Sequence, residues 1–280
     1  MAAPNHVVVG TLNAFVEAVD SQLEAARVRN GGVAFHQNWY RGISSVDHAL
    51  EPTLFRVARP APIDHLNAES LMMQEFDRHA ILRDGPKGDA DKREKILKLF
   101  EMQHYGVPTR LLDWTTNPFV GLYFALSSSK AFDKNPAVWV CDPWAWNRRI
   151  LEDRTWEDGG PAHVNDYAVE KYHPLGSRYD QTDVNKMEMK PVAIVGIYNS
   201  ERMRAQRGVF TLFGKNITTM ERVYDVDAQL ADSLFRIEVD KDQAKPMFEK
   251  LIQLGYTDSV AYPDFHGVAL EIRRKFGHLT

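Results

Sequence analysis

The chain has 280 residues, of which 44% are hydrophobic and 26% charged, a composition typical of a globular protein with its own core. Its 34 basic and 38 acidic side chains give a formal charge of −4, which excludes binding that depends on a strongly basic surface. The single cysteine, Cys141, excludes an intrachain disulfide. Because no stretch reaches the ~18 apolar residues that span a bilayer, and no export signal is recognisable, we expect a cytoplasmic protein without a membrane partner.

The first part of the chain predicts one helix, one strand and a loop. Apolar residues at spacings of three and four predict a helix over residues 11–29, which Thr11 is suited to cap. A β-prone run then leads to a strand that we expect to end near Arg41 and Gly42. Three prolines and little periodicity over residues 43–64 predict a surface loop.

Residues 65–104 are predicted to form a helical insertion or lid. Helical patterns run over residues 65–82 and 92–104, and a polar segment with glycine and proline separates them at residues 84–91. We interpret that polar segment as an internal linker. Residues 105–280 then supply the remainder of the core.

The second half of the chain mixes further strands with helices. A strand over residues 109–114 precedes a helix that Asn117 and Pro118 open in the preferred order of cap and then proline. Further strands are predicted over residues 137–141, 192–198, 208–213, 234–239 and 259–261, and helices over residues 242–254 and 264–275. Since the elements do not alternate regularly, the sequence predicts an α+β fold in a single domain, residues 1–280.

Two segments concentrate aromatic and hydrogen-bonding side chains: residues 39–42 (WYRG) and residues 103–115 (QHYGVPTRLLDWT). The second segment places a strand end directly before a helix N-terminus, where backbone N–H groups lack helical partners. Residues 115–117 are therefore candidates to receive a phosphate. The alternative is that their side chains only cap the helix.

Continued through residues 117–125, the second segment resembles the signature of the FRG domain family, which is named after a Phe/Tyr-Arg-Gly motif. In this chain that motif is Tyr40-Arg41-Gly42. Two further family-like elements follow in the expected order, at residues 202–211 and 261–267. The resemblance therefore extends over residues 39–267, although the family name alone implies no reaction.

The order of these motifs is also similar, more weakly, to that of ADP-ribosyltransferases of the arginine-serine-glutamate class. In that class an aromatic-Arg-Gly strand end binds the phosphates of NAD, a second strand end precedes a buried helix, and a later strand begins with the catalytic glutamate. Arg41, the strand end Asp113-Trp114-Thr115 and Gln206 hold these places here. The likeness implies a mixed or antiparallel β core with flanking helices, and NAD as a substrate.

The likeness also implies a set of site residues. Arginine forks suit a pyrophosphate, and aromatic faces suit a nicotinamide ring. The implied cofactor-binding residues are Tyr40, Arg41, Gly42, His104, Tyr105, Arg110, Trp114, Thr115 and Tyr123. Because the neutral Gln206 stabilises an oxocarbenium-like transition state only weakly, Asp113 and Glu201 join it as candidate catalytic residues, with Asp264 as a further acid.

Structural roles compete with these assignments. Arg41 is also suited to pair with an acidic side chain at its strand end, and Arg110 with Asp113 as a buried ion pair. His104 is as well suited to a structural role as to acid–base chemistry. No two histidines have the HExxH spacing, so the sequence predicts no metal site.

Three functional hypotheses follow. The first is an NAD-dependent ADP-ribosyltransferase that modifies a nucleic acid or a protein, as a toxin or defence effector with a cognate antitoxin as partner. The second is a non-catalytic module that recognises a nucleotide or nucleic acid, which the neutral Gln206 favours. The third is a metal-dependent hydrolase or nuclease that uses His104, Asp113 and Asp264.

Overall fold

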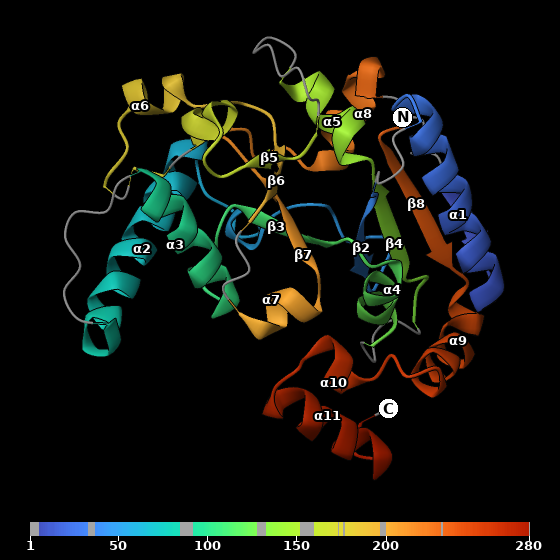
Figure 1. Cartoon of the computed structure of the whole chain (residues 1–280). Helices are drawn as coiled ribbons and strands as arrows, with labels where there is room; N and C mark the ends of the chain where they lie inside the picture. The colour runs from blue at the N-terminus through green and yellow to red at the C-terminus, as the bar shows by residue number, and fades with distance from the viewer. Residues whose placement is uncertain are drawn as a thin grey trace.

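The computed structural model describes residues 6–32, 37–84, 92–127, 133–151, 160–172, 174–175, 177–196, 200–230 and 232–279. Within these ranges the strands form one eight-stranded sheet, with helices packed around it (Figure 1). The strands are β1 (His6–Val9), β2 (Trp39–Ile43), β3 (Leu111–Thr115), β4 (Ala137–Cys141), β5 (Ala162–His163), β6 (Val192–Val195), β7 (Gly208–Leu212) and β8 (Leu234–Val239).

The helices vary from one turn to six turns in length. They are α1 (Leu12–Arg29), α2 (Pro62–Asp84), α3 (Lys92–His104), α4 (Pro118–Leu126), α5 (Pro143–Ile150), α6 (Gln181–Lys186), α7 (Glu201–Ala205), α8 (Met220–Val226), α9 (Lys241–Gln253), α10 (Asp258–Ala261) and α11 (Phe265–Lys275). Among the described residues, no helix is both long and apolar enough to cross a bilayer.

Local sequence explains where several helices begin. The Thr11 hydroxyl accepts a hydrogen bond from the Ala14 N–H, 3.1 Å away, at the start of α1. The Asn117 side chain accepts one from the Phe119 N–H at 3.0 Å, directly before α4. Asp264 caps α11 in the same way. The predicted starts of these three helices are therefore confirmed.

The sheet order is β1-β8-β4-β2-β3-β7-β6-β5. Neighbouring strands are antiparallel except for β1 with β8 and β5 with β6, which are parallel, so the predicted mixed sheet with flanking helices is confirmed. In the centre, β2 and β3 share one register pair, Tyr40 with Thr115, whereas each pairs along its whole length with its other neighbour. The sheet thus consists of two halves that separate beyond this pair.

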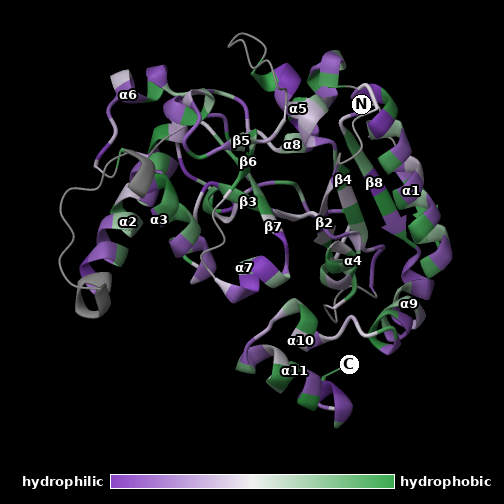
Figure 2. Ribbon diagram, in the orientation of Figure 1, coloured by the Kyte–Doolittle hydropathy of each residue, from purple (hydrophilic) through white to green (hydrophobic). Residues whose placement is uncertain are grey.

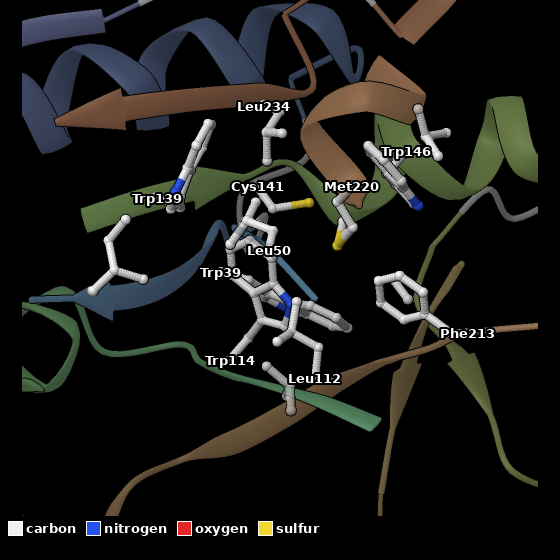
Figure 3. Packing of buried hydrophobic residues seen from close by; sticks show 14 of the residues in the cluster. Trp39, Leu50, Leu112, Trp114, Trp139, Cys141, Trp146, Phe213, Met220 and Leu234 are labelled. Carbon is white, nitrogen blue, oxygen red and sulfur yellow. The ribbon is translucent and has the colours of Figure 1, made fainter. Parts of the chain in front are cut away.

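Three hydrophobic clusters stabilise the two halves of the sheet. Helices α1, α4 and α9 pack on β2, β4 and β8, while α3 packs on β3, β6 and β7. The third cluster lies between the halves and contains four of the tryptophans, as Figure 3 shows. Its labelled members are Trp39, Leu50, Leu112, Trp114, Trp139, Cys141, Trp146, Phe213, Met220 and Leu234. In Figure 2 the hydrophobic colour gathers on the central strands, whereas α7 is coloured as hydrophilic.

The approach of α4 to β2 depends on Gly42. A Cβ atom at this position would lie 2.0 Å from the Gly121 carbonyl oxygen and 2.5 Å from the Ala125 nitrogen. No real Cβ approaches another atom so closely, so only glycine fits here. The glycine of the Tyr-Arg-Gly motif therefore has a packing role in the fold.

Several parts of the chain differ from the sequence prediction. Residues 259–261 form part of α10 and not a strand, because Asp258 at its start is held by Tyr123 and Arg274. Residues 43–64 do not only cover the surface, since Leu50 and Leu54 are buried in the central cluster. Strands β1 and β5 and helices α5, α6, α7 and α8 were not predicted. The predicted linker residues 85–91 and strand residues 197–198 lie outside the described ranges.

Candidate functional site

A cavity of about 860 Å³ lies where β2 and β3 separate. This volume is within the range of cofactor and substrate sites in proteins. Of the predicted site residues, the cavity is lined by Tyr40, Arg41, Gly42, His104, Asp113, Trp114, Thr115 and Gln206. The structure therefore brings together both sequence motifs and the later Gln206, which come from segments more than 60 residues apart.

Arg41 crosses the gap between the two strands. Its Nη1 donates a hydrogen bond to the Asp113 carbonyl oxygen at 2.6 Å and lies 3.9 Å from Asp113 Oδ2. Its Nε is buried and has no hydrogen-bond partner among the described residues. Burial lowers the pKa of Arg41 below its usual value, the Asp113 carboxylate opposes this, and the nearby Arg56 lowers the pKa further. The guanidinium is thus only partly compensated inside the cavity.

The Asp113 carboxylate is fixed by its neighbours although its side chain is 56% exposed. Gln103 Nε2 donates to Asp113 Oδ2 at 2.9 Å, and the Thr109 hydroxyl donates to Gln103 Oε1 at 2.6 Å. This chain of hydrogen bonds orients the Gln103 amide so that it presents its N–H to the carboxylate. Asp113 is therefore held as an acceptor at the cavity wall.

The turn from β3 into α4 satisfies its own backbone. The Thr116 N–H donates to the Arg207 carbonyl at 3.2 Å, and the Asn117 N–H donates to Thr115 Oγ1 at 3.0 Å. The Thr115 hydroxyl in turn donates to the Gln206 carbonyl at 2.5 Å. Since these N–H groups already have partners, the capping interpretation of residues 115–117 is confirmed and the phosphate interpretation is not.

Gln206 faces the cavity at the end of α7, but its side-chain amide is engaged. Gln206 Nε2 donates to the Ala261 carbonyl at 2.8 Å, which ties the site to α10. Beside it, the Arg202 guanidinium lies 4.5 Å from the centre of the Tyr262 ring. The end of α7 is thus anchored on α10 through both side chains.

Two further arginines, Arg56 and Arg202, line the cavity together with Arg41, as do the imidazole side chains of His48 and His104. Among the described residues neither Arg56 nor Arg202 forms an ion pair, and Arg56 Nη2 donates to the Glu51 carbonyl at 3.3 Å. The Asp47 carboxylate, also in the lining, is bound to Lys134. The lining also includes Glu51, so it contains three arginines and three carboxylates, and Arg56 and Arg202 are the arginines available to an anionic ligand.

Four predicted site residues lie outside the cavity lining. Arg110 is fully buried and pairs with Glu69 at 2.9 Å, so the expected Arg110–Asp113 pair is wrong. The Tyr123 hydroxyl donates to Asp258 at 2.6 Å in the core. The remaining two are Tyr105, which is 59% exposed, and Glu201, which is exposed on α7.

The residues for the hydrolase hypothesis do not converge. His104 and Asp113 line the cavity, but the Asp264 carboxylate accepts from the His266 and Gly267 N–H groups at the start of α11. Among the described residues, no group of three or more His, Cys, Asp and Glu side chains is arranged to hold a metal ion.

Sequence reasoning missed His48, Arg56 and Gln103 as lining residues. His48 and Arg56 come from residues 43–64, where the absence of periodicity gave no indication that the segment folds back over β2. Gln103 belongs to the recognised motif and directly precedes His104. This position could have identified it as a lining residue.

Comparison with known proteins identifies one family. Residues 36–134 match the FRG domain. No curated protein and no solved structure shows a significant match to the chain. The matched segment contains β2 and β3, and hence Arg41 and Asp113 on the two sides of the cavity, whereas Gln206 lies beyond it. The chain therefore contains a domain of the FRG family.

Proposed function

We propose that the cavity between β2 and β3 binds NAD and that the protein transfers the ADP-ribose part of NAD to a macromolecule. The observation that carries the proposal is Arg41, a half-buried side chain in an open cavity whose buried Nε has no hydrogen-bond partner among the described residues. An arginine fork donates two parallel charge-assisted hydrogen bonds to a phosphate, which matches this unsatisfied donor. Arg56, close enough to depress the pKa of Arg41, adds a second cation for the pyrophosphate.

The transfer needs a carboxylate, and Asp113 is the candidate acid whose position supports that role. As the bond between nicotinamide and ribose C1′ breaks, nicotinamide leaves with the bonding electrons and the ribose gains oxocarbenium character. A fixed carboxylate stabilises that charge electrostatically. The acceptor nucleophile then bonds to C1′ and releases its proton. Asp113 lines the cavity and is oriented by Gln103, while Glu201 is outside it.

In this proposal Gln206 is a positioning residue. Its amide N–H is committed to the Ala261 carbonyl and its backbone carbonyl accepts from Thr115. These two hydrogen bonds join β3, α7 and α10 at one wall of the cavity. Gln206 therefore shapes the wall of the cavity at α7 and does not supply the charge that the reaction needs.

Gln206 also favours a second candidate function. A neutral side chain stands where the similar transferase class has its glutamate, which is compatible with a module that binds a nucleotide without turning it over. Such a module would use Arg41 and Arg56 for the phosphates and Trp114 for a ring. The two functions share the binding site and differ in the release of nicotinamide.

The test uses the full chain with NAD labelled in its adenylate part, offered separately with DNA, RNA and cell lysate. Release of nicotinamide and transfer of label to one acceptor are the expected results. NAD binding without release or transfer would replace the transferase by the recognition module. Absence of NAD binding would overturn both functions.

A further inference from the structure

Helix α7 carries a concentration of arginines beside the cavity. Arg202, Arg204 and Arg207 occur within six positions, and none of them forms an ion pair with another described residue. Arg202 lines the cavity, and Arg204 and Arg207 are exposed. Glu201 is the acidic residue of the same helix. In a chain of net charge −4 this is a local basic surface.

The backbone of Arg207 adds an independent observation. Its φ of 48° lies in the left-handed region, which glycine and asparagine adopt far more readily than arginine. Its carbonyl accepts a hydrogen bond from the Thr116 N–H, so the turn that joins α7 to β7 needs this conformation. An arginine therefore stands at a position where a smaller residue would be less strained, which indicates a use for its charge.

Aromatic side chains lie on both sides of these arginines. Tyr105, 59% exposed, directly follows α3, and Phe100 of α3 shares a hydrophobic cluster with Met203 of α7. On the other side Tyr262 lies under Arg202, and Phe265, 91% exposed, begins α11. Figure 1 shows α7 between the end of α3 and the α10–α11 pair.

We infer that this surface binds single-stranded nucleic acid and that the acceptor of the proposed transfer is a base or a chain end of that strand; the second half of this inference rests on the proposed function. Arginines paired with no carboxylate are available to phosphates, and exposed aromatic rings are available to stack on bases. Arg202 belongs both to this surface and to the lining of the cavity. A duplex is disfavoured, because its bases are already stacked and paired and are not available to the exposed aromatic rings.

The test is fluorescence anisotropy of labelled oligothymidylate and mixed-sequence RNA, each of about 20 nucleotides, titrated with the full chain over a series of salt concentrations and without NAD. Saturable, salt-dependent binding is expected. The double variant Arg204→Gln, Arg207→Asn should bind about tenfold more weakly at low salt. Its slope of log Kd against log salt should fall by about 1.4, since each phosphate contact of a single strand contributes about 0.7.

Two controls separate binding from folding. Arg207→Asn removes the charge but relieves the left-handed strain, so the unfolding free energy should be equal or higher while binding weakens. Arg222→Gln removes an exposed arginine from α8, at another part of the molecule, and should leave the oligonucleotide affinity and its salt slope unchanged (Figure 1).

The outcomes distinguish the inference from the proposed function. No saturable binding of either oligonucleotide, or an unchanged salt slope in the double variant, overturns the inference. Tighter binding of a polyglutamate peptide than of either oligonucleotide would assign the surface to an acidic protein and overturn it as well. NAD binding is measured separately. Oligonucleotide binding without NAD binding would support the nucleic-acid surface and overturn the proposed transferase activity.

Discussion

Arg41 and Asp113 are joined across the gap in the centre of the sheet, where Arg41 Nη1 donates to the Asp113 backbone carbonyl at 2.6 Å. Beyond the pair of Tyr40 with Thr115, β2 and β3 no longer face each other in register. The guanidinium therefore bridges the two halves of the sheet where their backbones have separated, and it remains in the cavity that the separation opens. The same side chain contributes to the fold and to the proposed site.

Replacing Asp113 with Asn should slow nicotinamide release strongly while leaving NAD affinity nearly unchanged. The amide is of the same size and can still accept from Gln103, but it lacks the charge that stabilises the oxocarbenium-like transition state. We expect release to slow by about 100-fold or more. Glu201→Gln is the matched control, because it removes a carboxylate outside the cavity. Equal losses in both variants would contradict the role of Asp113.

Replacing Gly42 with Ala should destabilise the protein strongly. The new methyl group would meet the Gly121 carbonyl at 2.0 Å, so α4 has to move away from β2. We expect a loss of about 3 kcal/mol or more in unfolding free energy, measured by urea denaturation. Gly10→Ala is the control, since its Cβ would meet Gln243 at an ordinary 3.6 Å. A small loss of stability in Gly42→Ala would contradict the close packing of α4 on β2.

Replacing Glu69 with Gln should also reduce stability. Glu69 and Arg110 are both almost fully buried, with 2.9 Å between Arg110 Nε and Glu69 Oε2, and the substitution leaves the Arg110 charge uncompensated. We expect a loss of about 3 to 5 kcal/mol in unfolding free energy. Glu75→Gln, which breaks the exposed ion pair with Arg78, should change it by less than about 1 kcal/mol. An equally small loss of unfolding free energy in Glu69→Gln would contradict a structural role for Arg110.

Acid should weaken the attachment of the C-terminal helices through Asp258. Burial alone would raise the pKa of Asp258, but hydrogen bonds from Arg274 and Tyr123 outweigh it and hold the pKa below the usual value. Because the folded pKa is depressed, this stabilisation is complete above the unfolded value of about 3.9 and is lost as the pH falls through the folded pKa.

The measurement for Asp258 is a series of urea denaturations at falling pH. Asp258→Asn should be less stable than the parent chain at neutral pH, and the difference should shrink in the acid range. Asp225→Asn, at an exposed position of α8, serves as the control and should show no such change. A difference that stays constant with pH would mean that the charge of Asp258 does not matter.

Much of the fold could be predicted from local patterns. The caps Thr11, Asn117 and Asp264 mark helix starts because they satisfy backbone N–H groups within three residues, an interaction that sequence spacing reveals. Residues 259–261 were misassigned because three residues carry no period, and the helical turn there depends on Tyr123, more than 130 positions away.

The site could be predicted only in part, for a geometric reason. Residues of one motif point in different directions: Asp113 lines the cavity, whereas Arg110 lies in the core against Glu69. A residue that belongs to the motif therefore does not have to line the cavity. Arg56 was missed because its position depends on the path of a loop without periodicity, which local residues do not determine.

The most direct test of the proposed site is calorimetric titration of NAD into the full chain and into Arg41→Ala, with urea denaturation confirming that the variant is folded. We predict saturable one-to-one binding by the parent chain. The affinity should fall by about tenfold or more in Arg41→Ala, because a charge-assisted hydrogen bond to phosphate contributes about 1.5 to 3 kcal/mol. Absence of NAD binding, or equal affinity in both proteins, would contradict the assignment of this cavity to NAD.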